Sequence, residues 1–244
     1  MRLTRVFIDA PLESGTRVKL EGNAASHVTR VLRLRVGEAL TLFNGQGGEY
    51  AAGIEQLHGG SLTIAVGEHR AVERESTLSI TLAQGVSRGE RMDLVVQKAT
   101  ELGVSVLAPL LTERSVVRLD AQQAERKLNH WRAIAIAACE QSARNRLPQI
   151  LQPVSLREFL RHSRERGGTR LLLSPAALRR IAQLEAPPGE LSVLIGPEGG
   201  LSPEEQQAAL EAGFQSVRLG PRVLRTETAA LAALALLQYR FGDL

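Results

Sequence analysis

Two segments in the C-terminal part of the sequence, a glycine-rich loop and a Gly-Pro turn, hold the residue types best suited to chemistry. The first, at 196–200, reads Gly-Pro-Glu-Gly-Gly and contains Glu198. The second, at 219–228, contains Arg222, Arg225 and Glu227 in one short stretch. Glycine lets backbone approach a ligand closely, carboxylates accept protons, and arginines bind anions. The two segments therefore predict a ligand site, although the pattern of the first is also compatible with a simple tight turn.

Each segment lies between a β-prone stretch and a helix-like one, which is where open α/β sheets bind ligands. The helix after the first segment is well specified, with Ser202 as N-cap, Pro203 as first helical residue and Glu205 as capping-box partner. The helix after the second segment is almost purely apolar over 229–237. We expect that helix to be buried, in the core or in a subunit interface.

From about residue 75 onward, strands alternate with helices, which is typical of an α/β fold with a parallel sheet covered on both sides. The sheet is expected to hold a domain over 73–244. Its expected strands lie at 78–82, 104–110, 170–173, 191–195 and 216–219. Its expected helices lie at 90–102, 121–143, 156–166, 176–184, 203–212 and 226–241.

The preceding residues, 1–72, predict a separate small β-barrel. Its expected strands lie at 16–20, 39–43, 49–57 and 61–66, with one helix at 23–32 and a hairpin turn at 45–48. The alternation at 32–37 predicts a strand with Arg33 and Arg35 on one face. That face is a candidate nucleic-acid surface, and the alternative is an ordinary solvated strand face.

Composition narrows the class of function. All but three of the 30 basic residues are arginines, which indicates either phosphate binding or a biased genome. Aromatic residues make up only 3% of the sequence, which argues against a protein that binds single-stranded nucleic acid by stacking many bases on aromatic side chains. Cys139 is the only cysteine, and no zinc-type spacing of His or Cys occurs. We therefore expect no metal, no membrane span and a cytoplasmic protein.

The pentapeptide Gly-Val-Ser-Arg-Gly at 85–89 matches the nucleophile elbow of serine hydrolases. A triad of that type needs an acid and then a His after Ser87, and the last His of the chain is His162. The most distinctive motifs lie beyond it. A serine hydrolase therefore stays an alternative, and the simpler interpretation of 87–90 is the start of a helix.

The segments at 196–200 and 219–228, in this order and spacing, resemble those of the RsmE-type 16S ribosomal RNA uracil-N3 methyltransferases of the SPOUT superfamily. The similarity extends over nearly the whole chain, through the segments at 27–33, 97–103, 140–144 and 240–244. The resemblance implies a SPOUT-type parallel sheet with a C-terminal trefoil knot, preceded by a PUA-like RNA-binding barrel. It further implies a homodimer that uses S-adenosylmethionine to methylate 16S ribosomal RNA in the assembled small subunit.

The resemblance also implies a cofactor site built from the three loops of the knot, mainly through backbone groups. Carried onto this sequence, its residues are Leu172, Leu173, Ser174, Ile195, Gly196, Pro197, Gly199, Gly200, Leu219, Gly220, Leu224 and Thr226. RNA contacts are expected from Arg30, Arg33, Arg35, Arg114 and Arg144. A chain that kept the barrel but lost its chemistry would be a non-catalytic RNA-binding module, which is a further alternative.

Methylation of N3 requires removal of a weakly acidic proton and alignment with the methyl donor, whereas methylation of a ring carbon calls for a nucleophilic cysteine. Cys139 lies in an expected helix with no base beside it. Arg225 and Arg222 are candidates for stabilising the uracil anion. Glu198 and Glu227 are candidates for the proton acceptor. The alternatives are that Glu198 braces its own loop and that Glu227 is a carboxylate at a helix N-terminus, where it interacts favourably with the helix dipole. N3 lies on the pairing edge, so the target base must be unpaired or extruded.

Overall fold

The computed structural model describes residues 4–165, 167–185 and 189–244. The chain divides into two compact units. The first unit comprises Met1–Glu75 and Cys139–Leu147, and the second comprises Ser76–Ala138 and Pro148–Leu244. The predicted boundary after residue 72 thus lies three residues before the observed one. Residues 139–147, expected in the second domain, pack with the first unit.

The first unit is built on a five-stranded sheet with the strand order β1-β3-β4-β5-β2. The strands are β1 (Arg5–Phe7), β2 (Arg17–Leu20), β3 (Ala39–Phe43), β4 (Glu49–His58) and β5 (Ser61–Arg70). β1 pairs parallel with β3, and the other pairs are antiparallel. Alternate residues of β5 (Leu62, Ile64 and Val66) are buried in the unit's core, so the predicted alternation holds there.

The helix expected at 23–32 is two short pieces, α1 (Gly22–Ser26) and a single π-helical turn, η1 (His27–Val31). The strand expected at 32–37 is wrong. The backbone N–H of Leu34 bonds to the Val28 carbonyl rather than to a strand, and Arg33 adopts a positive φ of 58°. Arg33 and Arg35 are nevertheless exposed, while Val36, expected on the apolar face, is 55% exposed.

Buried ion pairs explain why 139–147 belongs to the first unit. Arg5 donates to Glu49 at 2.6 Å and to the side chain of Asn145 at 2.5 Å. Arg144 pairs with Glu75, and its side chain is only 5% exposed. Neither the spacing nor the local propensity of these residues reveals such long-range pairing, which is why the sequence placed the segment in the other domain.

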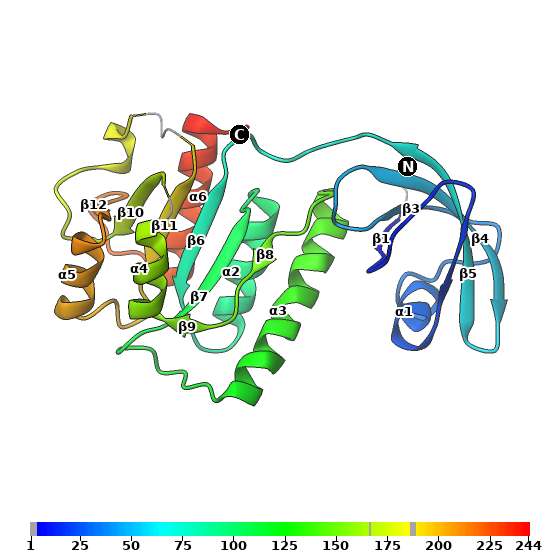
Figure 1. The fold of residues 1–244 in the computed structure, drawn as a ribbon, viewed down its shortest axis with the longest axis horizontal. Coiled ribbons are helices and arrows are strands. Elements are labelled where there is room, and N and C mark those ends of the chain that lie inside the picture. Colours follow the sequence, from blue (N-terminus) through cyan, green and yellow to red (C-terminus); the bar gives the residue numbers. More distant parts are fainter. Residues whose placement is uncertain (1–3, 166, 186–188) are drawn as a thin grey trace. The chain divides into compact units, whose positions relative to one another are not determined.

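The second unit holds a parallel sheet in the order β12-β10-β11-β6-β7-β8, with β9 also pairing with β7 (Figure 1). Its strands are β6 (Ile80–Gly85), β7 (Val106–Leu111), β8 (Gln149–Ile150), β9 (Val154–Ser155), β10 (Thr169–Leu173), β11 (Leu191–Ile195) and β12 (Gln215–Val217). Its helices are α2 (Glu90–Glu101), α3 (Ala121–Ser142), α4 (Leu156–Glu165), α5 (Pro203–Glu211) and α6 (Thr226–Phe241). The α/β class predicted from the sequence is confirmed. α3 begins in this unit, and its last four residues are grouped with the first.

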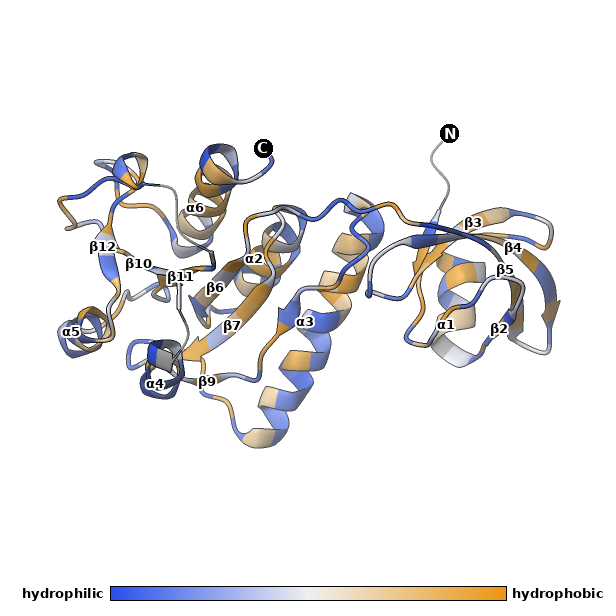
Figure 2. Ribbon diagram, turned by 45° about the horizontal axis from the view of Figure 1, so that its top comes forward, coloured by the Kyte–Doolittle hydropathy of each residue, from blue (hydrophilic) through white to orange (hydrophobic). Residues whose placement is uncertain are grey.

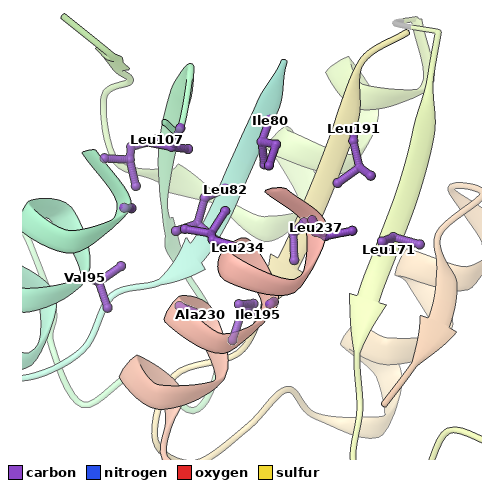
Figure 3. Close-up of a cluster of buried hydrophobic side chains, with 14 of the residues drawn as sticks. Ile80, Leu82, Val95, Leu107, Leu171, Leu191, Ile195, Ala230, Leu234 and Leu237 are labelled. Carbon is purple, nitrogen blue, oxygen red and sulfur yellow. The ribbon is translucent and has the colours of Figure 1, made fainter. Parts of the chain in front are cut away.

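Helices cover both faces of this sheet. Leu82 and Val193 point to a core shared with α2 and α6, and Figure 3 shows the α6 side chains against those of β6 and β11. Ala83 and Leu194, their neighbours in sequence, point to a second core shared with α4 and α5. Figure 2 shows α6 as mostly hydrophobic, as its burial requires, and α4 as largely hydrophilic.

Two local helix predictions in the second unit have different outcomes. The capping box is confirmed, since Ser202 accepts from the Glu205 N–H at 3.2 Å and Glu205 accepts from the Ser202 N–H at 3.0 Å. The helix expected at 176–184 is wrong, because only Ile181–Gln183 forms a short 3-10 turn. Backbone bonds that join Arg218 to Arg179 and Ile181 hold the chain around Arg180 in an extended bridge, overriding its helix propensity. Among the described helices, none is long and apolar enough to cross a membrane.

The Arg5–Glu49 pair yields a stability prediction. Replacing Glu49 with Gln should lower the free energy of unfolding by roughly 3 kcal/mol, because it leaves a buried guanidinium without its counter-charge. Glu55→Gln is the matched control, since its pair with Arg17 is solvent-exposed and should change stability little. Chemical denaturation of both variants measures the difference. Equal effects would contradict the assignment of the buried pair as structural.

The same comparison should depend on pH. Burial alone would raise the pKa of Glu49, but hydrogen bonds and charge from Arg5 and Arg74 hold this pKa below its ordinary 4.5. A carboxylate with a lowered pKa in the folded state stabilises the protein above the unfolded pKa. The stability gap between wild type and Glu49→Gln should therefore be full near pH 7 and shrink as the pH falls below about 4.5.

Candidate functional site

A cavity of about 570 Å³ lies in the second unit, beyond the carboxyl ends of β10, β11 and β12. Parallel strands bring their carboxyl ends to the same sheet edge, which is why loops distant in sequence meet there. The segments 172–175, 195–201 and 217–227 line the cavity. All sixteen residues predicted to bind cofactor or to act on substrate in the second unit are among its lining residues.

The loop after β11 is tied to the first residue of α6. Thr226 Oγ1 donates to the Gly196 carbonyl at 2.7 Å and accepts from Gln84 Nε2 at 2.9 Å. Gln84 Nε2 also lies 3.0 Å from the Gly85 carbonyl and 3.4 Å from that of Gly196. Gln84 is fully buried and Thr226 is 7% exposed, so water does not compete with these bonds. The Gln84–Thr226–Gly196 tie fixes one wall of the cavity.

Two glycines permit the close approach that this tie requires. A Cβ on Gly85 would lie 2.4 Å from the Pro197 nitrogen, and one on Gly196 would lie 2.9 Å from the Leu201 nitrogen. Both obstacles are backbone atoms, which cannot move aside as a flexible side chain can. Glycine is therefore required at both positions because of space, not because of an unusual φ.

Glu198 points back toward the start of α2. Its Oε1 accepts from the Arg88 backbone N–H at 3.0 Å and from Arg91 at 2.9 Å. Partial burial would raise the pKa of Glu198, but hydrogen bonds from its own N–H, from Arg88 and from Arg91 hold the pKa below its usual value. The carboxylate is thus ionised and already engaged. The geometry favours a bracing role for Glu198 over that of a proton acceptor.

The pentapeptide 85–89 supports the cavity instead of providing a nucleophile. Ser87 is only 3% exposed, and its Oγ donates to the Gly85 carbonyl at 3.4 Å. Cys139 is fully buried in the first unit, and burial raises the pKa of its thiol to about 12. Neither side chain is an activated nucleophile.

Five arginines line the cavity: Arg91, Arg114, Arg218, Arg222 and Arg225. Arg114 donates to the Gly199 carbonyl at 3.3 Å, and Arg222 and Arg225 are exposed at the rim. Glu227 presents a buried carboxylate oxygen that has no hydrogen-bond partner in the described parts of the chain. This combination can bind an anionic partner while keeping one carboxylate free to accept a proton.

The predicted RNA-contact residues are placed differently from one another. Arg30, Arg33 and Arg35 are exposed on the first unit, and Arg114 is exposed at the cavity of the second. Arg144 is buried against Glu75 and does not present its guanidinium to solvent. Within residues 4–165, 167–185 and 189–244, no group of three His, Cys, Asp or Glu side chains could hold a metal ion.

Sequence reasoning missed Gln84, Arg91 and Arg218. Gln84 offered a signal, because a long polar side chain next to glycine at the end of a buried strand needs a partner inside the protein. Arg91 and Arg218 offered none, since the sequence has many arginines in similar surroundings.

Comparison with known proteins fits this geometry. A family model described as an RNA methyltransferase domain matches residues 74–238, and one described as an RNA methyltransferase PUA domain matches residues 20–66. The ribosomal RNA small subunit methyltransferase E of Buchnera aphidicola subsp. Schizaphis graminum is 32% identical over 243 residues, which cover 100% of this chain and 98% of that protein.

Two solved structures agree over essentially the full length. A methyltransferase from Legionella pneumophila, in complex with bound cofactor SAM, is 42% identical with a TM-score of 0.95, covering 100% of both chains. A ribosomal RNA small subunit methyltransferase E from Neisseria gonorrhoeae, bound to S-adenosyl methionine, is 39% identical with a TM-score of 0.94, covering 99% of both chains. The resemblance seen in the sequence is confirmed, together with its separate PUA-like domain. The chain belongs to the family of ribosomal RNA small subunit methyltransferases E.

Proposed function

We propose that this protein transfers a methyl group from S-adenosylmethionine to N3 of a uracil in 16S ribosomal RNA (position 1498 in the family). The substrate is the assembled small subunit, and the protein acts in the cytoplasm. The observation that carries the proposal is the cavity at the carboxyl ends of β10, β11 and β12, lined by the loops that the family resemblance assigns to the cofactor. Family membership supports ribosomal RNA methylation. The N3 position is taken from the resemblance noted in the sequence, and the arginines and the unpartnered carboxylate oxygen of the cavity are compatible with it.

The cavity suits S-adenosylmethionine. Its volume of about 570 Å³ lies in the range of small-molecule sites, and Leu172, Ile195, Leu219 and Leu224 give it apolar walls. Glycines at 196, 199, 200 and 220 expose backbone groups along its loops. Pro197, Leu173, Ser174 and Thr226 complete the proposed cofactor set. When bound there, the cofactor supplies an electrophilic methyl group on sulfur.

The chain's own residues supply the remaining chemistry. Glu227, with its unpartnered buried oxygen, is the proposed proton acceptor for N3. Glu198 holds the loop through Arg88 and Arg91, as its hydrogen bonds indicate. Arg225 and Arg222, which are free of side-chain partners in the described structure and lie at the cavity rim, are proposed to stabilise the uracil anion.

RNA binding is proposed for Arg30, Arg33 and Arg35 of the first unit and for Arg114 of the second. All four are exposed, whereas Arg144 is left out because its guanidinium is buried against Glu75. These arginines would contact phosphates and position a folded RNA. Neutralising one of them should weaken binding to small subunits and flatten its salt dependence, whereas an unchanged salt slope would contradict the assignment.

A homodimer built on α6 is proposed as well. One side of α6 is buried, yet Leu236 is 44% exposed and Tyr239 is 77% exposed, and residues three apart on a helix share one face. Light scattering of the purified protein tests this proposal, since a monomer mass would contradict it. The trefoil knot around the three cavity loops stays a prediction from the family resemblance.

The function is tested directly by product identification. Wild-type protein, labelled S-adenosylmethionine and small subunits that lack the modification should yield labelled RNA whose digestion releases N3-methyluridine. Fully modified subunits are the control and should accept no label. Label in another nucleoside would contradict the proposed N3 position, and no transfer would contradict the proposed function.

The same assay distinguishes the two carboxylates. Glu227→Gln should lower the turnover number about 10²- to 10⁴-fold, the usual contribution of a general base, with cofactor affinity little changed. Glu198→Gln should chiefly weaken cofactor binding, because it loosens the loop held by Arg88 and Arg91. Glu204→Gln, exposed and outside the cavity lining, is the matched control. Unchanged turnover in Glu227→Gln would remove Glu227 as the proton acceptor.

A further inference from the structure

Arg218 is one of the five arginines that line the cavity. It directly follows β12 and lines the cavity. Its Nε is buried and has no hydrogen-bond partner among the residues the structure describes. Burying part of a guanidinium without a counter-charge costs free energy. The position of Arg218 therefore indicates that an anion of a bound ligand supplies the missing hydrogen-bond partner.

The backbone of Arg218 is held on both sides. Its N–H donates to the Arg179 carbonyl at 2.9 Å, and its carbonyl accepts from the Ile181 N–H at 3.0 Å. The preceding residues pair with β10 inside the sheet. The side chain therefore extends from a fixed point, and little backbone ordering remains to oppose ligand binding.

The other four arginines of the cavity differ from Arg218. Arg91 is paired with Glu198, and Arg114 donates to the Gly199 carbonyl. Arg222 and Arg225 are exposed at the rim, where water can solvate them. Among the arginines lining the described cavity, Arg218 alone has a buried nitrogen that lacks a partner.

We propose that Arg218 binds the carboxylate at the amino-acid end of S-adenosylmethionine. This inference rests on the function proposed above. The carboxylate is the only anionic group of that cofactor, and the planar fork of a guanidinium matches a carboxylate with two parallel hydrogen bonds. A phosphate of the RNA substrate is the competing anion, and binding measurements without RNA separate the two.

The test compares a ligand that carries the amino-acid end with one that lacks it. S-adenosylhomocysteine carries the amino-acid end, whereas 5′-methylthioadenosine lacks it. Calorimetry on Arg218→Gln should show an affinity for S-adenosylhomocysteine about 10- to 100-fold weaker than wild type, as expected for losing a charge-assisted hydrogen bond. Affinity for 5′-methylthioadenosine should stay unchanged, which also shows that the cavity of the variant is intact. The affinity of Arg218→Lys for S-adenosylhomocysteine should lie between those of wild type and Arg218→Gln, because lysine keeps the positive charge but lacks the planar fork of the guanidinium.

Arg180→Gln is the matched control. Arg180 is exposed, bridges to Arg218 through backbone and does not line the cavity, so its loss should change neither affinity. An equal loss for both ligands in Arg218→Gln would overturn the proposal, because Arg218 would then only support the cavity. Unchanged ligand affinities with weaker binding to small subunits would also overturn it, in favour of a phosphate contact. Failure of wild type to bind either S-adenosylhomocysteine or S-adenosylmethionine would instead overturn the proposed function.

Discussion

The bond between the Thr226 hydroxyl and the Gly196 carbonyl is the constraint on which the cavity depends. It joins the loop after β11 to the first residue of α6, and Gln84 closes the arrangement from the end of β6. Gly196 and Thr226, 30 residues apart in the sequence, thereby meet Gln84, which precedes both by more than a hundred residues. Because the bonds are buried, they are strong, and leaving any partner unsatisfied would carry the full cost of desolvation.

The rest of the site follows from that constraint. Gly85, at the end of β6, must lack a side chain because the backbone at Pro197 lies against it. Gly196 must lack one because its own loop turns back on it at Gly200 and Leu201. Glu198, carried by the same loop, is anchored to the start of α2, which leaves Glu227 as the cavity carboxylate with an unpartnered oxygen. Glu198 thus braces its loop, while Glu227 remains the proposed proton acceptor. The cavity arginines also differ in their partners. Arg91 and Arg114 bond to the loop after β11, whereas Arg218, Arg222 and Arg225 are the ones proposed to bind cofactor or substrate.

The cavity loops at 195–201 and 217–227 could be predicted from the sequence because glycine and proline follow apolar strands there, whereas the loop at 172–174 came only from the family resemblance. The helix α6 could be predicted because a long apolar run is expected to pack against a core. Features set by tertiary contacts could not. The pairing of Arg144 with Glu75 places 139–147 in the first unit, and backbone bonds to Arg218 hold 176–184 out of a helix. Glu198 and Glu227 looked equivalent in the sequence, since only the positions of Arg88 and Arg91 tell them apart.

The account is tested most directly by the affinity of Thr226→Val for S-adenosylhomocysteine. Valine keeps the shape of threonine but removes the hydroxyl, so the Gly196 carbonyl and the Gln84 amide each lose a buried partner. The account predicts that affinity falls about tenfold or more, while the exposed control Thr228→Val binds like wild type. Wild-type affinity in a folded Thr226→Val protein would contradict the claim that this tie builds the cofactor cavity.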